Sequence, residues 1–151
     1  MITVTTEVRK QFQFEAAHRL YENYKGKCAN LHGHNYVVEV VVRLREGQQL
    51  DATGFVIDFA RFEPLQRWVE ANWDHAVLLC ERDGDLVQFC RTQGLRYYLL
   101  PANPSAEIMC HELLKVASEH LDDNRCYVAE VSISESPTST ARVTRTVSGS
   151  G

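Results

Sequence analysis

Two long stretches of the chain alternate apolar and polar residues, a pattern typical of strands with one buried face. In the first, Phe12, Phe14 and Ala16 are followed at the same spacing by His18. In the second, the residues at alternate positions are His32, His34, Tyr36, Val38, Val40, Val42 and Leu44. Side chains two positions apart leave the same face of a strand, so three imidazoles point toward the predicted core. We expect strands over about residues 4–18 and 34–45.

A single histidine on a strand is more often a hydrogen-bonded core residue than a ligand. Three at matched spacing favour a metal site, because zinc accepts three imidazoles at about 2.0–2.1 Å and keeps a fourth position for water or substrate. We therefore predict that His18, His32 and His34 bind Zn²⁺. Cys28 lies nearby in the sequence, but a fourth, thiolate ligand would close the site. A cysteine beside a bound substrate can instead lose its proton and act as a base.

Length and charge restrict the kinds of protein this chain can be. With 151 residues, the chain has the size of one domain, which we place at 1–147, followed by a flexible Ser-Gly tail at 148–151. The net charge of −4 gives no general basic surface for nucleic acid. Arg19, Lys25 and Lys27 lie near His18 and Cys28 in the sequence and offer local positive charge to an anionic substrate, although a solvated loop carries such residues equally often.

Cysteine usage and hydropathy indicate the compartment. The five cysteines are odd in number and contain no Cys-x-x-Cys pair, so a disulfide framework is not expected. We find no basic and apolar leader at the N-terminus, and no apolar run approaches the ~18 residues of a membrane helix. We expect a cytoplasmic protein that binds no membrane.

The remaining pattern predicts helices between pairs of strands. We expect a short strand at 54–57, a helix capped by Asp58 that ends near residue 72, a shorter helix at about 84–92 and a strand at 95–100. Asn103 and Pro104 predict the cap and first position of a second long helix, and two strands follow at about 127–135 and 138–147. This order indicates an α+β domain with a mainly antiparallel sheet, whose exposed edges favour oligomerisation.

Two further sites carry ionisable side chains, and the sequence leaves two possible roles open for each. Glu135 follows Tyr127, Ala129, Val131 and Ile133 at alternate positions, so we expect its carboxylate to point inward. Its partner is either a structural arginine or a ligand edge with two parallel N–H donors. Asp74-His75 is either an exposed loop pair or, if His75 meets Cys28 across an interface, a relay that stabilises the thiolate.

Together these residues resemble the family of 6-pyruvoyltetrahydropterin synthase and 6-carboxytetrahydropterin synthase (QueD) over nearly the whole chain. The segments that carry the resemblance are Phe14-Glu15-Ala16-Ala17-His18, Cys28 with His32-Gly33-His34, Gly54-Phe55-Val56-Ile57-Asp58-Phe59, Asp74-His75, Asn103-Pro104-Ser105-Ala106-Glu107 and Glu135. Three residues separate Cys28 from His32, as in the QueD branch, whereas pyruvoyl-type synthases usually have a longer spacer. The resemblance therefore favours QueD.

The resemblance implies a tunnelling fold (T-fold) with two long helices on one face of the sheet. In this fold, the strands of three subunits join into a barrel, two trimers stack into a hexamer, and active sites lie between subunits. The implied reaction converts 7,8-dihydroneopterin triphosphate to 6-carboxy-5,6,7,8-tetrahydropterin, with release of acetaldehyde and triphosphate, on the path to queuosine.

The resemblance also implies roles for individual residues. Zinc on the three histidines would acidify the substrate's side chain. Cys28 would abstract a proton, and His75 with Asp74 would handle its return. Glu135 would anchor the pterin, with Ser105, Ala106 and Glu107 closing the pocket. Ala106 stands where relatives often have a hydroxyl residue, so we expect only a backbone contact there.

Two other functions compete with this one. A pyruvoyl-type synthase would eliminate triphosphate and leave the side-chain carbons attached. A non-catalytic zinc or pterin-binding module would need the histidines but would have no need for Cys28 and Asp74-His75.

Overall fold

The fold is a six-stranded sheet with helices on both of its faces. The computed structural model describes residues 1–147, so the expected tail at 148–151 lies outside the described residues. The strands are β1 (Glu7–His18), β2 (His32–Leu44), β3 (Ala76–Cys80), β4 (Tyr97–Leu100), β5 (Cys126–Ser136) and β6 (Ser139–Thr144). The α-helices are α1 (Glu63–Asn72), α2 (Gly84–Gln93) and α3 (Ala106–Leu121). Two 3-10 helices span Lys27–Ala29 and Phe59–Phe62.

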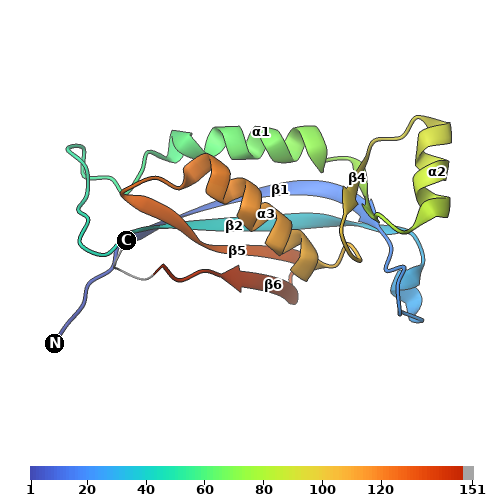
Figure 1. Cartoon of the computed structure of the whole chain (residues 1–151), viewed down its shortest axis with the longest axis horizontal. Coiled ribbons are helices and arrows are strands. Elements are labelled where there is room, and N and C mark those ends of the chain that lie inside the picture. Colours follow the sequence, from blue (N-terminus) through green and yellow to red (C-terminus); the bar gives the residue numbers. More distant parts are fainter. Residues whose placement is uncertain (148–151) are drawn as a thin grey trace.

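The strand order is β4-β3-β1-β2-β5-β6. The pairs β1–β2, β2–β5 and β5–β6 are antiparallel, while β3 joins both β1 and β4 in parallel. Helices α1 and α3 lie on one side of the sheet, and α2 stands at the end near β4 (Figure 1). The expected α+β class, with a mainly antiparallel sheet and two long helices on one face, is confirmed.

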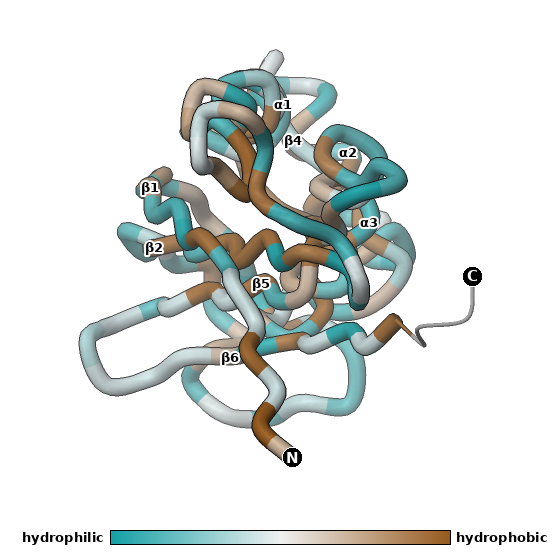
Figure 2. The backbone as a smooth tube through the Cα atoms, turned by 90° about the vertical axis from the view of Figure 1, so that its left-hand side faces the viewer, coloured by the Kyte–Doolittle hydropathy of each residue, from teal (hydrophilic) through white to brown (hydrophobic). Residues whose placement is uncertain are grey.

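The main core lies between the sheet and the helices α1 and α3. Phe14, Tyr36 and Trp73 are buried there, and the rings of Phe14 and Tyr36 stack with centroids 5.0 Å apart. Seen from the end, the apolar stretches of β2 and β5 run through the middle of the molecule below the helices (Figure 2). A second, smaller cluster joins Leu79 of β3 to Leu86 of α2. Because Leu78 belongs to the main core and neighbouring strand residues face opposite sides, α2 covers the other face of β3.

One strand prediction was wrong, and one strand was not predicted. Residues 54–57 form no strand; they belong to a loop in which the Asp51 carboxylate accepts hydrogen bonds from the N–H groups of Thr53 and Phe55. The strand β3 was missed, because Ala76–Cys80 is a short apolar run with neighbours on both faces and shows no alternation.

The start of α3 also differs from the prediction. Its cap is Ser105, whose hydroxyl accepts from the N–H of Ile108 at 3.2 Å, and the helix starts at Ala106. Pro104 therefore precedes the cap instead of occupying the first helical position. Asn103 caps no helix, and its amide bonds elsewhere.

A β-bulge interrupts the alternation that was expected along β5. Val40 pairs with Val131 but Val42 pairs with Val128, so β5 holds one extra residue at this point. Tyr127 and Ala129 consequently lie with Val41 in a separate cluster, not in the main core as predicted. Beyond the bulge, Val131 and Ile133 are in the main core. The register with β6 shifts again between Ser134 and Ser136, but the Glu135 carboxylate does point inward, since it lies 3.9 Å from Nε2 of His18.

None of the helices in residues 1–147 combines the length and apolarity that crossing a bilayer requires.

Candidate metal centre and its surroundings

The three histidines meet where β1 ends and β2 begins. The antiparallel register pairs His18 with His32 and Ala16 with His34. The ring centroids lie 4.7 Å apart for His18 and His32, 5.1 Å for His18 and His34, and 4.9 Å for His32 and His34. One nitrogen from each ring lies within 4.8 Å of the others. The predicted convergence is therefore confirmed.

Neighbouring backbone groups orient two of the rings. Nδ1 of His18 donates to the carbonyl of Pro104 at 2.6 Å, and Nδ1 of His32 donates to the carbonyl of Asn30 at 2.7 Å. With the proton fixed on Nδ1, each Nε2 keeps a lone pair for a metal ion. Burial lowers the pKa of His18, which favours the neutral, ligating form.

His34 supplies the test of whether a metal fits here. Its Nε2 is buried and has no hydrogen-bond partner among the described residues. A buried polar atom normally finds a partner, so this nitrogen lacks one that a metal ion would provide. The donor set of three neutral imidazoles accordingly fits a divalent transition metal.

A cavity of about 380 Å³ is lined by Glu135 and by Ser105, Ala106 and Glu107, which are four of the residues predicted to contact a substrate. Its lining residues are Leu20, Ser105, Ala106, Glu107, Glu135, Thr138, Ser139, Thr140 and Ala141. Oε1 of Glu135 lies 3.9 Å from Nε2 of His18. Among residues 1–147, no arginine pairs with Glu135, so the structural alternative for this carboxylate finds no support. The carboxylate instead lines the cavity next to the histidine cluster.

Cys28 lies on the 3-10 helix that precedes β2. Its carbonyl accepts from the N–H of Leu20 at 2.8 Å, which joins both ends of the loop between β1 and β2. Its side chain is partly exposed, whereas Cys80, Cys90, Cys110 and Cys126 are buried. A hydrogen bond to Cys28 raises the pKa of the Tyr24 phenol.

The two predicted basic residues differ in their surroundings. Arg19 makes a bidentate ion pair with Asp83, with its Nε 2.6 Å from Oδ2. Asp83 is only 1% exposed and caps α2, so this guanidinium anchors a helix. Lys27 is exposed on the turn that carries Cys28. Substrate contacts for both residues stay predictions.

Asp74 and His75 do touch, but they lie on the other face of the sheet. Nδ1 of His75 is 3.0 Å from Oδ2 of Asp74, and its Nε2 is 3.6 Å from the carboxylate of Glu15. Glu15 alternates with Ala16, which faces the core, so it points away from the histidine cluster. No hydrogen bond or ion pair in residues 1–147 links His75 to Cys28. Within one chain the proposed relay is therefore not assembled.

Backbone contacts fix the conformation of this pair. His75 has φ of 57°, and its N–H donates to the carbonyl of Glu15 at 2.6 Å. The carboxylate of Asp74 accepts from the Glu15 N–H at 3.0 Å. Burial opposes ionisation of Asp74, but this N–H and the His75 ring outweigh it and lower its pKa. Asp74 is thus held as the anion that orients the imidazole.

Fold and site together define an α+β protein with three convergent histidines beside an acidic, ligand-sized cavity. The family described as "6-pyruvoyl tetrahydropterin synthase" matches residues 7–146. The chain belongs to this 6-pyruvoyl tetrahydropterin synthase family, and it is accordingly an enzyme of the lyase type.

Curated relatives and solved structures agree with this assignment. A 6-carboxy-5,6,7,8-tetrahydropterin synthase from Rickettsia bellii is 30% identical over 131 residues, which covers 85% of this chain and 92% of the relative. The enzyme of the same name from Bacillus subtilis is 30% identical over 135 residues, covering 88% and 81%. The 6-pyruvoyl tetrahydropterin synthase of Plasmodium falciparum has a similar fold, with a TM-score of 0.70 at 24% identity, covering 96% of this chain and all of that one.

Proposed function

We propose that the chain is a zinc-dependent 6-carboxytetrahydropterin synthase. It would convert 7,8-dihydroneopterin triphosphate and water to 6-carboxy-5,6,7,8-tetrahydropterin, acetaldehyde and triphosphate, as a step toward queuosine and related deazapurines. The observation that carries the proposal is the cluster of His18, His32 and His34 next to the carboxylate of Glu135. The names of the curated relatives and the three-residue spacer after Cys28 favour this reaction over the pyruvoyl-forming one.

The cavity beside the histidines offers suitable contacts for a pterin. The carboxylate of Glu135 can accept two N–H groups of an aminopyrimidine edge in a bidentate arrangement. Ser105, Ala106 and Glu107, at the start of α3, line the same cavity and would bound the ring. The substrate's side chain would then extend toward the histidines, since Glu135 and His18 are neighbours.

The chemistry needs an acid and a base near that side chain. A zinc ion on the three histidines would supply Lewis acidity, which makes side-chain hydroxyls and the adjoining carbon more acidic. Cys28, as a thiolate, would abstract the proton. His75, oriented by Asp74, would return a proton to the substrate.

These roles require more than one copy of the chain. His75 lies on the face opposite the histidine cluster, so we propose that the His75 of one subunit reaches the Cys28 of another. A ring of three chains that closes the sheets into a barrel, or two such rings stacked as a hexamer, would provide the interface. Because all five cysteines are free thiols, we propose the reducing cytoplasm as its location.

Product analysis with purified zinc-loaded protein and 7,8-dihydroneopterin triphosphate tests the proposal. Equimolar acetaldehyde and triphosphate are the expected result. Triphosphate without acetaldehyde would identify a pyruvoyl-type synthase instead. Release of neither product, with zinc retained, would favour a binding module. Cys28→Ala protein at the same zinc content is the control for uncatalysed breakdown of the substrate.

A further inference from the structure

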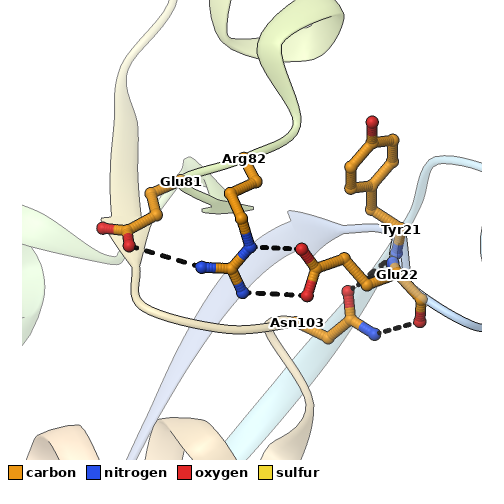
Figure 3. A network of polar contacts seen from close by, with 5 residues as sticks. All are labelled: Tyr21, Glu22, Glu81, Arg82 and Asn103. Carbon is orange, nitrogen blue, oxygen red and sulfur yellow. Dashed lines mark hydrogen bonds and ion pairs between the residues drawn. The ribbon is translucent and has the colours of Figure 1, made fainter.

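The side chain of Asn103 holds the beginning of the loop between β1 and β2. Its Oδ1 accepts from the N–H groups of Tyr21 at 3.0 Å and Glu22 at 2.8 Å. Its Nδ2 donates to the carbonyl of Glu22 at 2.8 Å. Figure 3 shows this amide directed at the Tyr21–Glu22 backbone from the segment that leads into α3. One side chain thus satisfies three backbone groups of a loop far away in the sequence.

A second contact holds the same point of the loop from another direction. The carboxylate of Glu22 makes a bidentate ion pair with Arg82, in which the second pair of atoms is 2.8 Å apart. Arg82 follows β3 and also lies 3.5 Å from Glu81 (Figure 3). This pair is exposed to solvent, where ion pairs contribute little. The three hydrogen bonds of Asn103 are therefore the main restraint.

The restrained residues connect directly to Cys28 at one end and to the metal centre at the other. Leu20, next to Tyr21, donates its N–H to the carbonyl of Cys28 at 2.8 Å, so this hydrogen bond couples the Leu20–Glu22 backbone to the residue that carries the thiol. On the opposite side, Pro104 follows Asn103 and accepts the Nδ1 proton of His18. Asn103 thus joins the backbone that orients a histidine to the loop that carries the thiol.

We infer that Asn103 is a positioning residue that fixes the Cys28 thiol relative to the histidine cluster. The inference rests on the proposed function for its catalytic meaning. Only a side chain that both accepts and donates can bond the two N–H groups and the carbonyl, and an amide of this length does so. Aspartate would keep the acceptor, lose the donor and add a charge beside the Glu22 carbonyl. Alanine would remove all three bonds.

Alkylation of Cys28 by iodoacetamide measures the restraint without substrate or turnover. The other four cysteines are buried, so in the folded protein the reaction reports Cys28. We expect Asn103→Ala to react about 10-fold faster than wild type, since losing its three hydrogen bonds frees the loop. Asn103→Asp should show a smaller increase. Turnover should fall on the order of 10²-fold in Asn103→Ala, the cost of a small misplacement of a reacting group.

Asp51→Ala is the matched control. This variant also removes side-chain bonds to two backbone N–H groups, but it does so in the loop that follows β2, at the other end of the sheet. It should leave the alkylation rate and kcat unchanged even if it lowers the melting temperature.

Two results would overturn the inference. One is an alkylation rate in both Asn103 variants equal to that of wild type, and the other is faster alkylation with unchanged kcat. An inactive wild-type protein whose Asn103→Ala variant still reacts faster would overturn the proposed function alone. The two failures are therefore distinguishable.

Discussion

At the scale of single residues, each histidine of the cluster has a different neighbour. Backbone carbonyls hold the Nδ1 protons of His18 and His32, and the buried Nε2 of His34 lacks a partner. A three-ligand site has no spare donor, so losing two imidazoles should abolish zinc binding. We predict that a His32→Ala, His34→Ala double variant contains no zinc by elemental analysis.

The matching control is His111→Ala, an exposed histidine on α3, which should retain one zinc per chain. Full zinc occupancy in the double variant would show that the zinc binds elsewhere.

Cys28 is expected to act on the substrate and not on the metal. Cys28→Ala should therefore keep its zinc and its melting temperature while losing roughly 10²–10⁴-fold in turnover, the range for a general base. Zinc analysis and kcat measured on the same preparation check this. Loss of zinc would make the thiol a ligand, and near-normal turnover would exclude it as the base.

Glu135 is expected to recognise the substrate. In Glu135→Gln, a neutral amide replaces the carboxylate that would accept two N–H groups, at a cost of roughly 1.5–3 kcal/mol in binding. We predict a higher KM with zinc content unchanged. Pterin affinity and melting temperature are the measurements. A large loss of stability with pterin binding intact would assign the carboxylate a structural role.

At the scale of elements, the docking of α2 depends on one buried carboxylate. Asp83 caps α2 through the N–H of Leu86 and pairs with Arg19 at the end of β1. Asp83→Ala removes the cap and leaves the half-buried guanidinium without its partner. We predict a loss of roughly 1–3 kcal/mol in unfolding free energy, measured by urea denaturation.

Asp83→Asn keeps an oxygen for the cap but removes the charge, so its stability should lie between those of wild type and Asp83→Ala. Equal stability of all three proteins would contradict a structural role for the pair.

The elements that sequence predicts well are those with a clear period. The long strands β1 and β2 were recognised because one face of each is apolar, and this alternation also located His18, His32 and His34. β3 was missed because both of its faces are covered. Asn103 was taken for a cap because local sequence cannot show that its partners lie near residue 22, which only the tertiary fold brings close.

At the scale of the whole molecule, the active site should be divided between subunits. Mixing Cys28→Ala chains with His75→Ala chains, each inactive alone, should restore activity by pairing an intact thiol with an intact imidazole. With random assembly, about one quarter of the interfaces would carry both intact groups. Refolding the two variants together and measuring turnover checks this.

The control is each variant refolded alone under the same conditions. If the mixture stays inactive although mass measurements show mixed oligomers, His75 and Cys28 do not share a site across an interface.

The bulge in β5 changes which residues of that strand face the main core. Val128 and Val131 on β5 pair with Val42 and Val40 on β2, so three residue steps on β5 match two on β2. The alternation of inward and outward side chains therefore shifts by one residue at this point. One half presents Tyr127 to the outer face, and the other presents Glu135 to the histidines. Deleting Ala129 would put Val128 and Val131 two positions apart, so a continuous alternation would keep both on the face they occupy now. The inserted residue therefore lets Val128 and Val131, three positions apart in the sequence, both face the main core.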